Sequence, residues 1–323
     1  IYINANSGAG ILLDAGSASI TELSILSQTH ISGGNTGLLI NGGSAAVSGN
    51  SINNLSLAGQ SGKYISLTNN ALSNVVLDAT GTYFDESSGS DKNLYQNFYT
   101  EDRIDHKIDD SSLGFVLVKA GNDFVTSNSF ITPVTTAPSV QRGISSASAG
   151  FTVNVDNGIF TEDIEVNKRL TISGSSSDSL IINGLYSGNP NTVLISSDSV
   201  SLKNMTVTRD YGADLASWHA ASKTNGISFA QNTTGIKIEN AVITGNRIGI
   251  SINNSQNASI TNCLIDSNYA GVVFSNNVNG TVLNNCYIQN NFTHGILFDF
   301  DAGVLSAENA GIINNSISGN WYS

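Results

Sequence analysis

Two aspartates near the C-terminal end of the sequence have the type and spacing for acid–base chemistry. Asp299 and Asp301 are separated by one residue in an extended stretch, so their side chains would share one face. Two carboxylates on one face could be the pair that a glycosidase uses, or part of a Ca²⁺ site. Carboxylates beside an insertion are more often a solvated turn, so the sequence leaves both interpretations open.

A loop of about residues 209–224 carries a second group of candidates. They are Asp210, Tyr211, Asp214, Trp218 and His219. An aromatic ring on a loop can stack on a sugar ring, which predicts a glycan-binding surface centred on Trp218. The alternative is that Trp218 only packs the loop onto the wall of the protein. In an enzyme, His219 would join Asp299 and Asp301 as a catalytic group.

These candidates belong to a repeating sequence, which determines how they can be positioned. A phrase with two asparagines returns after 22 and then 23 residues, and its asparagines are Asn240, Asn246, Asn262, Asn268, Asn285 and Asn291. A fixed period of this length indicates a solenoid. Asparagine tolerates a left-handed corner, and its amide can bond to the equivalent asparagine one repeat away. The pattern predicts a structural ladder, although the asparagines could instead form a row of ligands.

Short apolar runs within each repeat predict strands. Ile236–Ile238, Val242–Ile243 and Ile248–Ile252 are separated by Asn and Gly residues. Three short strands in about 22 residues leave no room for a helix. We therefore predict an all-β solenoid, a parallel β-helix, whose coils stack about 4.8 Å apart around columns of aliphatic residues.

The repeat breaks in the middle of the chain, which divides it into three segments. Residues 1–84 form the first, less regular β-helical segment. Residues 85–138 form an irregular connector, and residues 139–323 form the second β-helix with the loop inserted at 209–224. A solenoid grows along its axis, so length alone does not limit the number of domains.

Two short helices are expected at the boundaries of these segments. In the connector, Ile104 and Ile108 have helical spacing within the polar stretch Tyr99–Asp110. At the start of the second β-helix, Ser139 is a suitable N-cap, and apolar residues of Val140–Ala147 fall on one helical face. A helix there would cover the first coil, whose backbone groups would otherwise recruit other strands.

Composition excludes several classes of partner. The chain of 323 residues has 13 Lys plus Arg against 25 Asp plus Glu, for a formal net charge of −12. This charge repels phosphate backbones and anionic lipid, so we expect no nucleic-acid partner. The sequence also lacks a run of 18 apolar residues, so we expect no membrane insertion.

The two cysteines follow equivalent asparagines of neighbouring repeats. Cys263 and Cys286 should therefore lie on adjacent coils, at a separation compatible with a disulfide. Free stacked thiols in an apolar column are an equal alternative. A metal site is not expected, because no histidine or third cysteine shares the register.

Two stretches resemble known protein families. Residues 139–174 and the later Asn-x-x-Gly coils resemble right-handed parallel β-helices of the pectin-lyase-like superfamily. Residues 101–122 resemble a connector in very large bacterial surface proteins that join several β-helices. The resemblance implies a right-handed parallel β-helix and an extracellular or cell-surface location. It does not specify an activity, because the superfamily includes lyases, hydrolases, epimerases, tailspikes and adhesins.

Two functional hypotheses follow. The first is a non-catalytic structural and interaction module of a bacterial cell-surface or secreted fibre or adhesin, whose lateral faces bind glycan or a cell-surface protein. The alternative is a polysaccharide lyase or hydrolase acting on an acidic polysaccharide. No cofactor is expected, apart from Ca²⁺ at the carboxylates. A strand-like start and an interrupted last repeat also suggest a continuing chain or end-to-end self-association.

Overall fold

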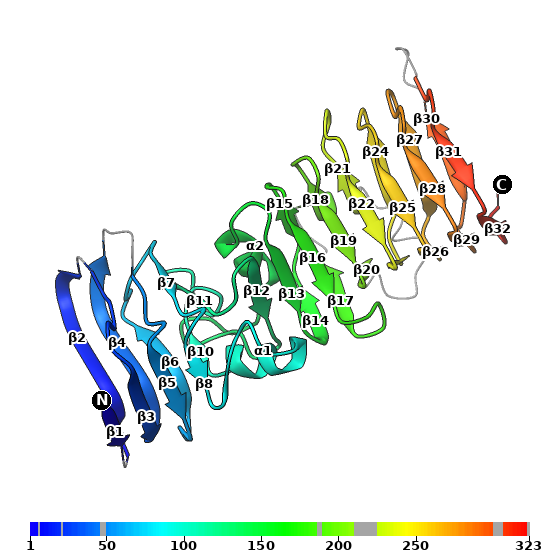
Figure 1. The fold of residues 1–323 in the computed structure, drawn as a ribbon. Coiled ribbons are helices and arrows are strands. Elements are labelled where there is room, and N and C mark those ends of the chain that lie inside the picture. Colours follow the sequence, from blue (N-terminus) through cyan, green and yellow to red (C-terminus); the bar gives the residue numbers. More distant parts are fainter. Residues whose placement is uncertain are drawn as a thin grey trace. The chain divides into compact units, whose positions relative to one another are not determined.

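Short parallel strands dominate the computed structural model (Figure 1). It describes residues 1–323 except 6, 21, 46–49, 186–188, 210–224, 300–305 and 322–323. The chain divides into two compact units, Ile1–Ala147 (unit 1) and Ser148–Ser323 (unit 2). Within the described residues, neither helix has the length and hydropathy needed to span a membrane.

Unit 1 is built from strands that pair from coil to coil. One sheet runs in the order β1 (Tyr2–Ala5), β3 (Thr29–Gly33), β5 (Leu55–Ala58), β8 (Tyr83–Phe84) and β9 (Ser87–Ser88). A second sheet runs in the order β10 (Ile104–Asp105), β6 (Lys63–Thr68), β4 (Thr36–Ala45) and β2 (Ala9–Ile20). A third pairs β11 (Phe115–Leu117) with β7 (Val76–Asp78). All these pairs are parallel except β8 with β9, where the chain turns back on itself.

Strands from the middle of the chain complete the core of unit 1. β10 places Ile104 beside Ile65, and β11 places Val116 beside Leu77. All four side chains are buried in one apolar cluster. The compact units therefore divide the chain differently from the expected segments 1–84, 85–138 and 139–323, because the connector adds strands to the sheets that the first coils begin.

The helix expected within Tyr99–Asp110 is wrong in position. α1 spans Leu94–Glu101, and the chain after it forms β10 and turns. Ile104 and Ile108 are both fully buried. Ile104 lies in a strand and Ile108 in a turn. Their spacing of four residues matches one face of a helix, although no helix is present there.

The second expected helix is confirmed. α2 spans Val140–Ser146, preceded by strand β12 (Asn122–Val125). The Ser139 hydroxyl accepts a hydrogen bond from the Arg142 N–H at 3.1 Å, which satisfies one of the free donors at the start of the helix. Val140 and Ile144 are fully buried, as the apolar pattern predicted.

Unit 2 is a parallel β-helix with three sheets. Sheet I contains β13 (Thr152–Val155), β16 (Thr171–Gly174), β19 (Ser201–Lys203), β22 (Lys237–Glu239), β25 (Ser259–Thr261), β28 (Val282–Asn284) and β31 (Gly311–Ile313). Sheet II contains β14 (Gly158–Thr161), β17 (Leu180–Gly184), β20 (Thr206–Arg209), β23 (Val242–Thr244), β26 (Leu264–Asp266), β29 (Tyr287–Gln289) and β32 (Ser316–Ser318). Sheet III contains β15 (Ile164–Val166), β18 (Asn191–Ile195), β21 (Asn225–Phe229), β24 (Ile248–Asn253), β27 (Ala270–Ser275) and β30 (Ile296–Asp299). Each coil contributes one strand to each sheet, except that the described part of the last coil contributes only β31 and β32 to sheets I and II. The predicted fold is therefore confirmed.

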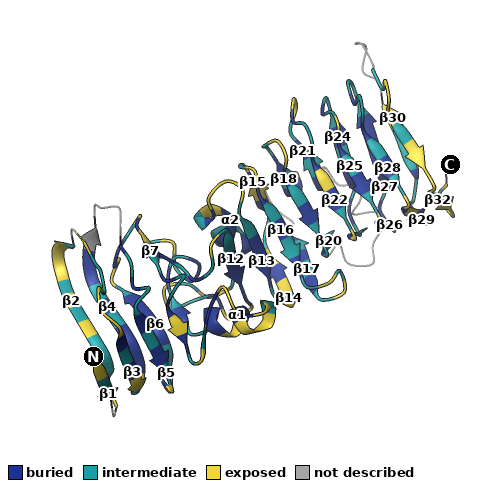
Figure 2. Cartoon of the chain, viewed as in Figure 1, coloured by how far each residue is buried: buried dark blue, intermediate teal, exposed yellow. Residues whose placement is uncertain are grey.

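The registers align apolar residues of successive coils into buried columns. The inward column of sheet II consists of Phe160, Ile182, Val207, Ile243, Ile265, Ile288 and Ile317. The first six side chains are at most 1% exposed, and Ile317, on the last coil, is 39% exposed. Figure 2 shows buried residues repeating from strand to strand along unit 2. Short strands with a period of two residues therefore supply the core, as the sequence pattern predicted.

Exposed asparagines form the corner between sheets I and II. Asn240, Asn262 and Asn285 have positive φ angles of 52°, 56° and 52°. The Asn285 side-chain amide donates to the Asn262 side-chain oxygen at 2.7 Å. These residues thus combine a left-handed turn with a hydrogen bond between coils, the two properties of asparagine on which the predicted ladder was based.

A second file of asparagines lies inside the wall. Asn246, Asn268 and Asn291 are at most 1% exposed. The Asn268 side-chain oxygen accepts from both the backbone N–H and the side-chain amide of Asn246, at 3.0 and 3.1 Å. Likewise, the Asn291 side-chain oxygen accepts from the backbone N–H and the side-chain amide of Asn268. The Asn320 side-chain oxygen accepts from the same two groups of Asn291. The oxygens of Asn268, Asn291 and Asn320 therefore each accept from buried donors on the coil before, whereas the Asn246 oxygen, at the start of the file, has no partner among the described residues.

Removing one of the buried amides should destabilise the protein much more than changing an exposed one. In Asn268→Ala, the Asn246 N–H loses its acceptor in a buried site, which should lower the free energy of unfolding by about 2–4 kcal/mol. The control Asn262→Gly keeps the positive φ and should cost less than about 1 kcal/mol. Urea unfolding followed by circular dichroism measures both; equal losses would contradict the role of the inner file.

Candidate functional site

Most of the site residues that the sequence singled out lie outside the described residues. These are Asp210, Tyr211, Asp214, Trp218, His219 and Asp301. Asp299 is described: it ends β30 and is exposed, next to Phe298, whose ring stacks on Phe274 at a centroid distance of 4.9 Å. The structure thus positions one member of the proposed carboxylate pair on the outer surface of sheet III.

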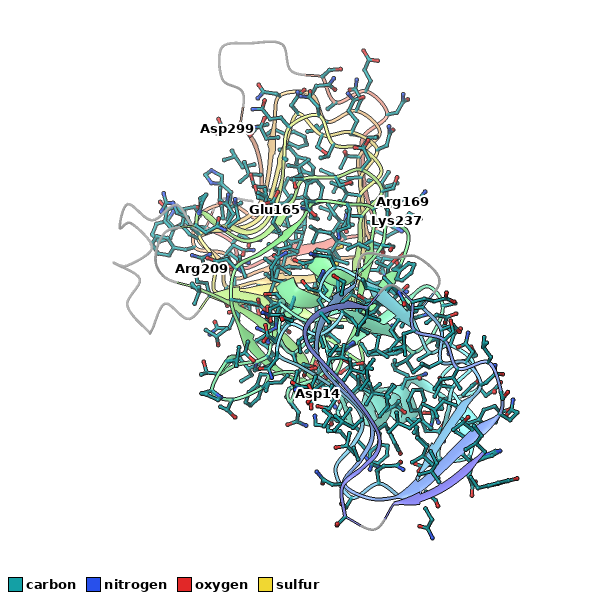
Figure 3. All side chains as sticks on the ribbon, turned by 90° about the vertical axis from the view of Figure 1, so that its left-hand side faces the viewer. Asp14, Glu165, Arg169, Arg209, Lys237 and Asp299 are labelled. Carbon is teal, nitrogen blue, oxygen red and sulfur yellow. The ribbon has the colours of Figure 1, made fainter. Side chains whose placement is uncertain are left out.

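Charged side chains of unit 2 come from several sheets. In Figure 3, Glu165, Arg209 and Asp299 lie at different places around unit 2, whereas Arg169 and Lys237 are labelled close together. Lys237 belongs to sheet I, Arg209 to sheet II, and Glu165 with Asp299 to sheet III. This distribution does not bring these groups together for catalysis.

Sheet II presents mainly uncharged groups on its outer face. One outward column consists of Thr161, Asn183, Thr208, Thr244, Asp266, Gln289 and Ser318. The other consists of Ile159, Ile181, Thr206, Val242, Leu264, Tyr287 and Ser316. The one carboxylate in these columns accepts hydrogen bonds from Ser267 and Asn290 at 3.0 and 3.1 Å. This wall offers hydroxyl, amide and apolar contacts along several coils.

Arg209, which directly precedes the undescribed residues 210–224, has a buried side chain held by an ion pair and hydrogen bonds. Its side chain is 1% exposed and pairs with Asp163 at 2.9 Å. It also donates to the Thr192 hydroxyl at 3.2 Å and to the Leu185 carbonyl oxygen. Burial raises the pKa of Asp163, while a hydrogen bond from Leu185 and the charge of Arg209 oppose that rise. Arg209 thereby joins three segments of the wall.

Unit 1 contains a buried cluster with the composition of a metal site. Ligand atoms of Glu101, His106 and Asp109 lie within 4.8 Å of one another. His106 Nε2 lies 2.6 Å from Glu101 Oε1, and its Nδ1 accepts from the Val116 N–H at 3.0 Å. Asp109 accepts from the backbone N–H of His106 at 2.9 Å. Since both ring nitrogens and one oxygen of each carboxylate are engaged, the cluster fits a structural hydrogen-bond network better than a metal centre.

Burial sets the protonation of this cluster. Burial raises the pKa of Asp109 to about 7, and the nearby Glu101 carboxylate adds to the rise. Burial also lowers the pKa of His106, but the carboxylates of Glu101, Asp109 and Asp123 together raise it by more, so that pKa lies above its usual value. The bond from Val116 opposes protonation of Nδ1, so we place the proton of a neutral ring on Nε2, where it bonds to Glu101.

One groove on unit 1 was not predicted from the sequence. It has a volume of about 710 Å³, and its lining includes Asp85, Glu86, Lys92, Tyr95, Gln96 and Tyr99. The sequence analysis treated residues 85–138 as an irregular connector and assigned no binding site to them. A signal was present, because Tyr95 and Tyr99 are four residues apart in a helix that Asn93 and Gln96 cap reciprocally.

The two cysteines lie on adjacent coils as free, buried thiols. The Cys286 sulfur lies 3.4 Å from the backbone nitrogen of Cys263 and accepts its hydrogen bond. On the next coil, the Asn315 side-chain oxygen accepts from the Cys286 N–H at 2.8 Å. The Cys286 sulfur thus occupies the same acceptor position as an asparagine oxygen. The hydrogen bond with Cys286, together with burial, raises the pKa of Cys263, which disfavours a reactive thiolate.

The two thiols should be protected in the folded protein. We expect Cys263 and Cys286 to react with an aromatic disulfide reagent at least about 100-fold more slowly than in urea, because burial limits access to both. In urea, two thiols per chain should titrate. A denatured chain that yields none until reductant is added would contradict the free state and favour the disulfide.

Asp109 should make stability depend on pH. Its pKa is higher in the folded state than its usual value of 3.8, so the folded protein binds the proton more tightly. Stability from this group is therefore present at low pH and is lost as the pH rises from about 4 to about 7. Relative to the wild type, Asp109→Asn should gain on the order of 1–4 kcal/mol at pH 7.5 and less than about 1 kcal/mol at pH 4. Urea midpoints at both pH values test this; parallel pH profiles would contradict it.

Comparison with known proteins gives one structural match. No protein-family model matches the chain, and no curated protein matches it. A solved structure, pectin methylesterase from Yersinia enterocolitica, is similar with 17% sequence identity and a TM-score of 0.36. The match covers 54% of this chain and 69% of that chain. A likeness at this level carries no argument about activity, and the parallel β-helix is established by the strand registers of unit 2.

Proposed function

We propose that the chain is a non-catalytic structural and interaction module of a cell-surface or secreted fibre. Its role is to hold lateral faces in a fixed arrangement, where they bind glycan or protein. The observation that carries this proposal is the outer face of sheet II, whose columns repeat hydroxyl, amide and apolar groups over successive coils. Such a surface offers many similar contacts.

The organisation of the wall supports a scaffold. Coils are joined by parallel backbone pairing in three sheets and by the buried file that contains Asn246, Asn268 and Asn291. Preorganised surfaces lose little conformational entropy when they bind a partner. A catalytic centre instead needs several ionisable groups that converge on one cleft. The described cluster that does converge, Glu101 with His106 and Asp109, is buried and hydrogen-bonded.

The proposal predicts that the chain does not cleave polysaccharides. Incubation with polygalacturonate, pectin and neutral β-glucan, with and without Ca²⁺, should release no reducing ends and no unsaturated uronate above the buffer control. Asp299→Asn and the matched wall variant Asp266→Asn should give the same result. Cleavage by the wild type that Asp299→Asn abolishes and Asp266→Asn preserves would overturn the proposal in favour of a carbohydrate-active enzyme.

A further inference from the structure

We propose that the groove of unit 1 binds a neutral pyranoside oligosaccharide. The proposal deepens the interaction role given above and rests on it, because it assigns a ligand class to one particular surface. The groove lies where α1 approaches the turn between β8 and β9, and it combines two aromatic rings with carboxylate and amide groups. Its volume of about 710 Å³ is in the range of small-molecule sites.

The two tyrosines supply a stacking surface. Tyr95 and Tyr99 are 67% and 54% exposed, although both contribute to the lining of the groove. Residues four apart in a helix are neighbours on one face, so the two rings belong to the same surface. The C–H face of a pyranose is apolar and packs on an aromatic ring, while its hydroxyls remain at the edge for hydrogen bonding.

One of these rings is held in place by an arginine. The Arg103 guanidinium lies 4.0 Å from the ring centre of Tyr64 and 5.6 Å from that of Tyr99. Arg103 also donates to the Tyr99 hydroxyl at 3.1 Å and to the Gly62 carbonyl oxygen at 3.0 Å. Tyr99 is therefore oriented before a ligand arrives, which reduces the entropic cost of binding.

The acidic lining determines which sugars the groove can accept. Asp85 sits in a left-handed turn, with φ of 59°, and its carboxylate accepts from the Tyr64 hydroxyl. Glu86 follows it and is exposed. Carboxylates accept hydrogen bonds from sugar hydroxyls but repel uronate groups. Two cations lie nearby. Lys92 is only 8% exposed, and the Arg103 guanidinium is engaged by Tyr64, Tyr99 and the Gly62 carbonyl oxygen, so neither is available to pair with a uronate group. The ligand is therefore a neutral sugar and not an acidic one.

Calorimetric titration of the full chain tests the proposal. The probes are cellohexaose, laminarihexaose and mannohexaose, with hexagalacturonic acid as the charged counterpart. At least one neutral probe should bind, and hexagalacturonic acid should bind at least about tenfold more weakly. Tyr95→Ala and Tyr99→Ala should each weaken the neutral probe about tenfold, because each removes a stacking ring.

Matched variants separate binding from folding. Tyr2→Ala removes a tyrosine that is 87% exposed on β1, outside the groove lining and outside sheet II, and it should leave the affinity unchanged. Tyr99→Phe keeps the ring and should lose less affinity than Tyr99→Ala. Glu86→Gln should improve binding of hexagalacturonic acid without weakening the neutral probe by more than about twofold, since the amide still accepts hydrogen bonds. Circular dichroism confirms that each variant is folded.

Each outcome decides a different point. Failure of all three neutral probes to bind, or tighter binding of hexagalacturonic acid, would overturn the assigned ligand class. Neutral binding that survives both tyrosine-to-alanine changes would overturn the groove as the site but leave the interaction role standing. Cleavage of a bound probe would overturn the non-catalytic role while leaving the groove as its binding site.

Discussion

Parallel backbone pairing between successive coils is the interaction on which unit 2 depends. Each strand bonds to its counterparts on the coils before and after, so the coils must keep a common register. A common register requires corners of nearly constant geometry. Asn240, Asn262 and Asn285 supply one such corner, because asparagine adopts a positive φ at lower cost than most residues. The repeating asparagines are thus a consequence of strand pairing.

The inner asparagine file shows how a polar group can be stabilising inside an apolar wall. A buried amide is costly when its hydrogen bonds are unmet. Asn268 avoids that cost, because its amide donates to the Ile243 carbonyl oxygen at 2.9 Å and its oxygen accepts from the preceding coil. Cys286 fills an equivalent need elsewhere, since its sulfur accepts from the Cys263 N–H. At these positions, the backbone N–H of the preceding coil needs a side-chain acceptor of suitable size. Asparagine supplies it in most coils, and Cys286 supplies it in one.

The sequence was sufficient for the fold of the regular coils but not for the irregular parts of unit 1. The period of 22 or 23 residues and the runs of Ile and Val predicted three strands per coil, because each coil repeats the same order of short apolar strands and turns. Ser139 likewise predicted the start of α2, because its side chain can cap a helix by a local hydrogen bond. In the connector, burial of Ile104 depends on its pairing with β6, which is distant in sequence, so helical spacing gave the wrong element. Of the predicted site, the described residues include only Asp299.

The same contrast explains where specific recognition can arise in such a chain. A wall of repeated coils presents similar side chains at each level, so its contacts are numerous and alike. Distinct chemistry requires residues that break the repeat. Tyr95 and Tyr99 lie on a helix, and Asp85 lies in a turn where β8 and β9 run antiparallel. These departures from the coil bring together an aromatic surface and carboxylates that no single repeat contains. In the proposed role, the regular coils form the scaffold and the interruption forms the specific binding site.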